Sequence, residues 1–154
     1  MRRFLFVVAL SATCLMVAAG CGSNGSSSDD GGRPAAGGIG SAPQQSAQAL
    51  WNAYATRLGK RDYAGVCALF TESGAASFAK QFKASNCEGA AISLAGTWSD
   101  ESLKNLAASP KEPHTSQVKE SSANMSSCGL GVLYMVKLDR GWLINEHHGQ
   151  PGYC

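Results

Sequence analysis

Apolar residues recur every three or four positions through the middle of the chain, a spacing that predicts amphipathic helices. From residue 43 to residue 60 they form a single stripe: Ala47, Leu50, Trp51, Tyr54 and Leu58. Gly59 is placed to end this first helix. Asp62 is the expected N-cap of a second helix, whose apolar positions are Tyr63, Val66, Cys67 and Phe70. Each helix therefore has one apolar face that needs a partner surface.

More helical structure is expected before residue 110. Phe78 and Phe82 lie one helical turn apart in a segment that leads to Cys87. Ser99 precedes two acidic residues and is typical of an N-cap, so it predicts one more short helix that stops before Pro110.

The pattern changes after Pro113. Residues 129–148 contain two runs rich in β-branched and aromatic residues, separated by Asp139-Arg140-Gly141, and they predict a β-hairpin. Weaker strands are expected near 117–120 and 123–127. Helices followed by an antiparallel sheet of three to four strands predict an α+β domain with the helices on one face of a curved sheet.

The hairpin register decides which side chains face the helices. If Leu138 pairs with Trp142, Val136 pairs with Ile144 and Tyr134 pairs with Glu146. Because side chains alternate along a strand, Trp142, Ile144, Glu146 and His148 would point toward the helices, with Tyr134 and Val132 across from them.

The opposite face would then carry Leu133, Met135 and Leu143. Three apolar side chains on a sheet face that no helix covers indicate that another surface packs on it. That surface could be a second copy of this chain in a homodimer, or another envelope protein. Coverage by the loops of the weaker strands is the alternative.

The N-terminus has the pattern of an export signal at residues 1–20. Arg2 and Arg3 precede the apolar run FLFVVALSATCLMVAA, which is shorter than a membrane-spanning helix usually needs. Ala18, Ala19 and Gly20 before Cys21 resemble the lipobox of bacterial lipoproteins. The resemblance implies cleavage before Cys21 and a lipid on its sulfur, which would anchor the protein to the outer face of the cell membrane.

Residues 21–40 then form the lipidated cysteine and a linker. Seven glycines and four serines between residues 22 and 40 leave too little apolar surface to offset the entropy of ordering. We expect a flexible tether that ends where the domain of residues 41–154 begins.

Charge and cysteine content narrow the function classes. Beyond residue 40 there are ten basic and nine acidic residues, which is no basis for binding nucleic acid. Four cysteines in this region, Cys67, Cys87, Cys128 and Cys154, fit the disulfides of an exported protein. We expect no cofactor and no metal site, because no two cysteines are closely spaced.

Cys67–Cys87 with Cys128–Cys154 is the favoured disulfide pairing. A Cys67–Cys87 bond would join consecutive helices, and Cys128 falls opposite residue 152 in the hairpin register, close to Cys154. The pairing Cys67–Cys128 with Cys87–Cys154 stays open.

The domain resembles the nuclear transport factor 2-like superfamily, an α+β cone, and in particular its exported versions in actinobacterial lipoproteins. The resemblance rests on ALWNAYATRLGKRDYAGVCALFTES, on CEGA and on the closing VKLDRGWLINE. Gly59, Asp62 and Tyr63 match the turn after the first helix, and Gly141, Trp142 and Ile144 match the final strand. It implies a cone whose open end holds a pocket; some members are isomerases or dehydratases, and many bind ligands without catalysis.

Three side chains would converge near that pocket. Glu146 could act as a base, with Tyr134 or His148 as a donor to a developing oxyanion. The alternative is that Glu146 and His148 lie at the rim and Tyr134 is core. A slip of the register by one residue would instead turn Asn145 and His147 inward.

Binding without catalysis is the favoured function. Trp51, Tyr54, Tyr134, Trp142 and Glu146 are the expected ligand-binding residues, although Trp51 and Tyr54 also fit a plain core. We expect a lipid-anchored module of the cell envelope that binds a small apolar ligand or a protein. The alternatives are an isomerase or dehydratase that uses Glu146 and a structural tether in an envelope complex.

Overall fold

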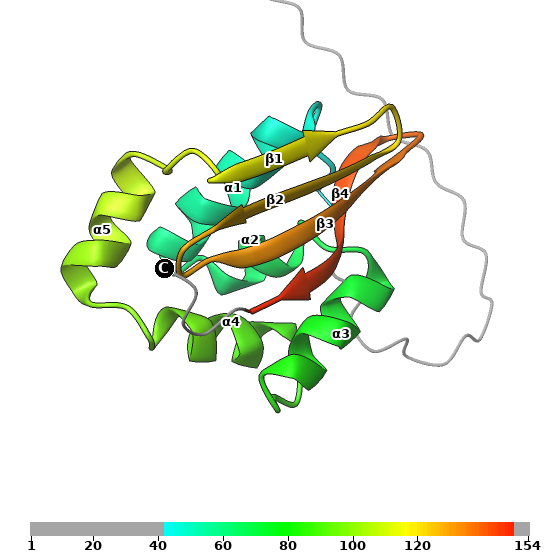
Figure 1. Cartoon of the computed structure of the whole chain (residues 1–154). Helices are drawn as coiled ribbons and strands as arrows, with labels where there is room; N and C mark the ends of the chain where they lie inside the picture. Colours follow the sequence, from blue (N-terminus) through cyan, green and yellow to red (C-terminus); the bar gives the residue numbers. More distant parts are fainter. Residues whose placement is uncertain (1–41, 150–154) are drawn as a thin grey trace, which may run out of the picture. The chain divides into compact units, whose positions relative to one another are not determined.

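Five helices pack with a four-stranded antiparallel open sheet in this protein, which is an α+β fold as predicted (Figure 1). The computed structural model describes residues 42–149. The predicted signal segment, the lipidation site at Cys21, the linker and Cys154 lie outside the described residues. The helices are α1 (Ala47–Gly59), α2 (Tyr63–Cys67), α3 (Glu72–Gln81), α4 (Cys87–Ala95) and α5 (Asp100–Ala108).

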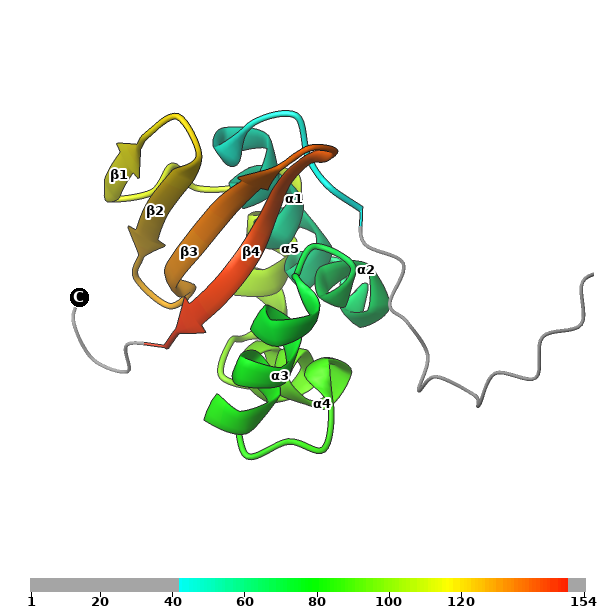
Figure 2. The same ribbon diagram turned by 90° about the vertical axis from the view of Figure 1, so that its right-hand side faces the viewer.

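The strands follow the helices in the chain and are paired in sequence order. They are β1 (Thr115–Val118), β2 (Ser122–Ser127), β3 (Gly131–Leu138) and β4 (Gly141–His148). The helices lie on one side of this sheet, as Figure 2 shows. The other face of the sheet is left open to solvent at many of its polar positions.

Each helix begins at a side chain that caps it. The residue before each helix accepts a hydrogen bond from the backbone N–H three positions later, which satisfies one of the free donors at the helix start. The caps are Ser46, Asp62, Thr71, Asn86 and Ser99. Asp62 and Ser99 confirm two predictions, whereas α4 was not expected as a separate helix because most of its buried side chains are alanines.

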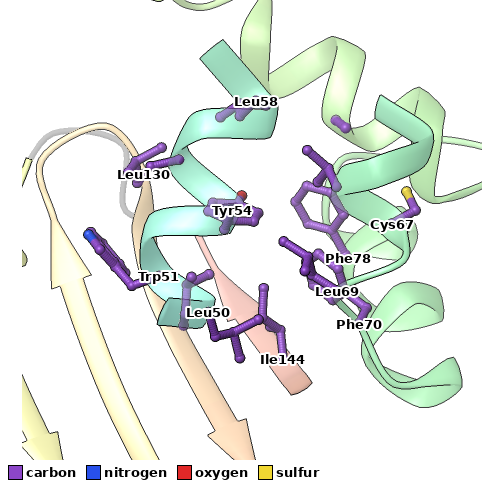
Figure 3. Close-up of a cluster of buried hydrophobic side chains, with 14 of the residues drawn as sticks. Leu50, Trp51, Tyr54, Leu58, Cys67, Leu69, Phe70, Phe78, Leu130 and Ile144 are labelled. Atoms are coloured by element: carbon purple, nitrogen blue, oxygen red, sulfur yellow. The ribbon is translucent and has the colours of Figure 1, made fainter. Parts of the chain in front are cut away.

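The hydrophobic core lies between the helices and the covered face of the sheet. The stripe of α1 is buried as predicted, and Trp51, Tyr54 and Leu58 have no exposed surface (Figure 3). Ile144 of β4 and Leu130, just before β3, meet this stripe from the sheet side. The apolar periodicity therefore located the core on the helix side correctly.

A disulfide joins Cys67 at the end of α2 to Cys87 at the start of α4, with a Cα to Cα distance of 5.8 Å. Both cysteines are buried. This confirms the predicted Cys67–Cys87 bond and excludes the alternative Cys67–Cys128. The Cys128–Cys154 pairing involves a residue outside the described part of the chain.

The register of the β3–β4 hairpin differs from the prediction at the turn. Leu138 pairs with Gly141, so the turn has two residues rather than three, and Val136 pairs with Leu143 rather than with Ile144. A β-bulge between Tyr134 and Met135 then restores the predicted pairing of Tyr134 with Glu146. Asn145 is the extra residue of β4 at this bulge.

The turn and the bulge together reverse faces that the sequence suggested, because the two-residue turn shifts β3 and the bulge shifts the end of β4. Met135, paired with Ile144, points into the core and is 1% exposed, and Leu133 is completely buried. The prediction that Leu133 and Met135 form an outward apolar patch is therefore wrong. Only Leu143 lies on the open face, opposite Val136, and it is itself buried.

The N-terminal half of α3 holds the bulge in place. Thr71 donates its backbone N–H to the carbonyl of Ile144 at 2.9 Å, and its hydroxyl donates to Oδ1 of Asn145 at 3.2 Å. A Cβ at Gly74 would lie 2.6 Å from the Ile144 carbonyl oxygen and 2.8 Å from that of Asn145. Glycine at this position thus permits the close contact between α3 and β4.

Replacing Gly74 with alanine should destabilise the protein. The added methyl group must displace the backbone of β4, and we expect a loss of about 1 to 2 kcal/mol in the free energy of unfolding, after allowing for the better helix propensity of alanine. Chemical denaturation would measure this loss.

Gly96→Ala is the matched control for Gly74→Ala. Gly96 caps α4 in a helical conformation, and a Cβ there would meet no atom closer than 3.4 Å. This control should be neutral or slightly stabilising. Equal effects at the two glycines would contradict the proposed contact.

Candidate functional site

The open face of the sheet carries a polar row that crosses all four strands. Gln117 pairs with Asn124, Asn124 with Tyr134, and Tyr134 with Glu146. Directly paired residues project from the same face of a sheet, so the four side chains lie next to one another. We call Gln117, Asn124, Tyr134 and Glu146 the polar row.

A groove of about 320 Å³ lies along this row. Its size is at the lower end of the range for small-molecule sites. We call it the sheet groove; the residues that line it are Gln117, Lys119, Ser122, Ala123, Asn124, Tyr134, Met135, Val136, Asn145 and Glu146. Most of these side chains are polar and exposed, because they stand on the face that the helices leave uncovered.

Contacts within the polar row are few and weak. Nδ2 of Asn124 donates to Oε1 of Gln117 at 3.4 Å, which is long for a hydrogen bond. Oε2 of Glu146 lies 3.4 Å from Nε2 of His148, and the rings of Tyr134 and His148 meet edge to face with centroids 5.2 Å apart. The polar groups of the row therefore keep capacity for further hydrogen bonds.

The predicted triple of Tyr134, Glu146 and His148 does come together, but on the open face. The sequence placed it inside, facing the helices, and that orientation is wrong. Tyr134 is 41% exposed, and the side chains of Glu146 and His148 are 48% and 55% exposed. The carboxylate therefore stands in solvent rather than in the apolar pocket that the catalytic hypothesis placed around it.

The other expected ligand-binding residues lie in the core. Trp51 is completely buried, and its indole Nε1 donates to the carbonyl of Lys111 at 2.8 Å. Trp142 is 5% exposed and belongs to the same core. Both side chains therefore belong to the core; for Trp51 this is the alternative that the sequence left open, whereas for Trp142 it differs from the prediction.

Tyr54 is unusual among the core residues. Its side chain is completely buried (Figure 3), and its hydroxyl has no hydrogen-bond partner among residues 42–149. Burial raises the pKa of Tyr54 above its ordinary value, so the phenol stays neutral. A buried hydroxyl without a partner costs stability. The ring of Tyr54 lies near those of Phe70 and His147, with centroids 6.1 Å apart in each pair.

His147 is the buried polar residue that the main register prediction missed. The bulge at Asn145 turns it inward, as the alternative of a one-residue slip would, and leaves it 2% exposed. Its Nε2 lies 2.8 Å from the carbonyl oxygen of Leu130, which can only accept, so Nε2 carries the proton. Nδ1 then accepts from the side-chain amide of Gln81 at 3.1 Å.

The pKa of His147 is lowered to about 4, mainly by burial; the hydrogen bond to Leu130 opposes this shift, and the nearby His148 adds to it. Phe78 and Phe82 enclose the ring, with centroids 4.8 and 5.9 Å away. The imidazole is therefore neutral near neutral pH, and both of its nitrogens are occupied. The hairpin register predicted His148 rather than His147 as the inward histidine, and the bulge reverses that choice.

Among residues 42–149, no three His, Cys, Asp or Glu side chains gather as a metal site would require. Within the same residues, no helix is long and apolar enough to cross a bilayer. No protein-family model, curated protein or solved structure matches the chain. The sheet groove is therefore assigned from its own chemistry.

Proposed function

We propose that this protein is an exported, lipid-anchored binding protein of the bacterial cell envelope, and that its sheet groove holds a small polar ligand without catalysis. The observation that carries the proposal is the groove itself, which is about 320 Å³ in size and lined by polar side chains around one half-exposed tyrosine. The lipobox-like residues before Cys21 support the anchor, and the order of helices and sheet is compatible with a nuclear transport factor 2-like domain.

The ligand differs from the apolar one expected from sequence. That expectation placed the ligand between the helices and the sheet, where Trp51, Tyr54 and Trp142 now prove to be core. The exposed site has amide, hydroxyl, carboxylate and ammonium groups instead. Such groups favour a ligand with its own hydrogen-bonding groups, since an apolar molecule would leave them without partners.

Side-chain amide resonances in NMR spectra would test the proposal directly. The full chain, isolated with its lipid in detergent micelles, would be mixed with the low-molecular-weight fraction of its own cell envelope. We expect the amide signals of Gln117, Asn124 and Asn145 to shift. The amides of Gln48 and Asn52 on α1 form an internal control, because these exposed residues hydrogen-bond to each other away from the sheet.

Two results would count against binding in the groove. Unchanged groove amides would refute it, as would equal shifts of the α1 pair. The enzyme alternative makes a separate prediction, since Tyr134, Glu146 and His148 do lie together. If the protein is an enzyme, the native chain should consume a compound in the envelope fraction, and the Glu146→Gln variant should leave that compound unchanged.

A further inference from the structure

We infer that the ligand of the sheet groove is a neutral saccharide; this rests on the groove being the binding site. Sugars present a patch of C–H groups on one side and a ring of hydroxyls at the edge. A protein site for them therefore needs an accessible aromatic ring and several groups that can donate and accept hydrogen bonds. The sheet groove combines the two.

The aromatic component is Tyr134, at the centre of the polar row. Its ring is 41% exposed, whereas Trp51, Tyr54 and Phe78 are fully buried. It is the only large ring that lines the groove. The negative face of an aromatic ring attracts positively polarised hydrogens, so an exposed ring favours the C–H side of a sugar.

The hydrogen-bonding component consists of three carboxamides around the ring. Gln117 and Asn124 lie on one side of Tyr134, and Asn145 and Glu146 lie on the other, across the sheet. Each carboxamide offers two donors and one acceptor oxygen, which matches hydroxyl groups that also donate and accept. Ser122 adds a hydroxyl at the end of the groove near the turn.

The bulge supplies one of these amides. Asn145 lines the groove, and Thr71 at the start of α3 donates to its Oδ1. Its NH₂ group keeps its donors for a ligand. The irregularity that turned His147 inward thus also added a hydrogen-bonding side chain beside Glu146.

The charges of the groove exclude other ligand classes. Lys119 and Glu146 are the only charged residues that line it; Lys119 directly follows β1, whereas Glu146 lies on β4 at the other edge of the sheet. One cation is a poor basis for binding phosphate, which favours arginine clusters or helix N-termini. Val136 is the only half-exposed aliphatic side chain in the lining, so the groove also lacks apolar anchors for a lipid or a peptide.

The size of the groove fits one or two sugar rings. Small-molecule sites begin at roughly 300 Å³, and this groove is at that limit and open to solvent. An open site buries little of its ligand, so affinity for a disaccharide should be modest, with a dissociation constant in the range of about 0.1 to 10 mM.

Titration of the full chain with defined sugars would test the inference. The probes are cellobiose and diacetylchitobiose, with the dipeptide Ala-Glu and inorganic phosphate as competitors of other classes. The micelle must be a detergent without a sugar headgroup, since alkyl glycosides would occupy the site. We expect at least one sugar, and neither competitor, to shift the amides of Gln117, Asn124 and Asn145.

Three variants assign the binding to the ring and the amides. Tyr134→Ala should raise the dissociation constant about tenfold, whereas Tyr134→Phe should raise it no more than about threefold, because the ring is kept. Asn124→Ala should weaken binding about three- to tenfold. Gln48→Ala on α1 is the control and should leave affinity and the unfolding midpoint unchanged.

The outcomes separate this inference from the proposed function. If both sugars fail and the envelope fraction still shifts the groove amides, the saccharide assignment is wrong and the binding function stands. If the envelope fraction fails as well, both are wrong. Sugar binding that survives Tyr134→Ala, in a variant with a native unfolding midpoint, would also overturn the assignment to this groove.

Discussion

Acidification from about pH 7 to about pH 4.5 should cost this protein roughly 2 to 3 kcal/mol of stability through His147 alone. Burial lowers the pKa of His147 to about 4 in the folded protein, against 6.5 for an ordinary histidine. Below pH 6.5 the unfolded chain therefore binds a proton that the folded protein does not, until the pH approaches 4. The stability that neutral His147 contributes is complete above pH 6.5. It is lost progressively between pH 6.5 and about pH 4, and it decreases no further below about pH 4.

The physical cause is the environment of the ring. His147 is enclosed by Phe78, Phe82 and Tyr54, and its nitrogens are used by Leu130 and Gln81. A proton on Nδ1 would displace the hydrogen bond from the Gln81 amide and place a charge among aromatic side chains. In the described part of the chain no acidic side chain is hydrogen-bonded to the ring, and the electrostatic effect of His148 opposes protonation of His147.

Urea denaturation of two histidine variants across this pH range is the measurement. His147→Gln removes the titrating group and keeps a donor for the Leu130 carbonyl. Between about pH 7 and about pH 4.5 this variant should therefore lose roughly 2 to 3 kcal/mol less stability than wild type. His148→Gln is the matched control, because its side chain is 55% exposed. It removes only the smaller effect of His148 on the pKa of His147, so this variant should retain most of the loss on acidification. If His147→Gln shows the same loss on acidification as wild type, the buried neutral histidine is not its source.

Loss of the Cys67–Cys87 disulfide should destabilise the protein by about 3 kcal/mol, the value for closing a loop of this length in the unfolded chain. The double variant Cys67→Ala/Cys87→Ala removes the bond. Because the effect lies mainly in the unfolded chain, the dependence of unfolding free energy on denaturant should also become steeper.

Reduction provides the control for this prediction. Adding a reductant to wild type should reproduce the loss seen in the double variant, together with the contribution of any other disulfide. Adding the reductant to the double variant measures the contribution of any other disulfide by itself. A double variant as stable as the oxidised wild type would contradict the stabilising role of the bond.

The sequence by itself determined most of the elements and their order, with α4 as the exception. Apolar spacing located α1 and its buried stripe, capping residues located the starts of α2 and α5, and β-branched runs located the hairpin. These signals are local, since they depend on residues within one or two turns of each other. The Cys67–Cys87 bond was also within reach, because the two cysteines are only 20 residues apart in the chain, although it joins α2 to α4 rather than consecutive helices.

The faces of the hairpin were decided by tertiary structure. A two-residue turn and a bulge at Asn145 reassigned Tyr134, Glu146 and His148 to the open face and His147 to the core. A strand has a period of two, so one inserted residue reverses every side chain beyond it. The bulge is held by contacts of Thr71 and Gly74 with β4, some seventy residues away in the chain. The residues around Asn145 cannot predict such a contact, because it forms only when the chain has folded.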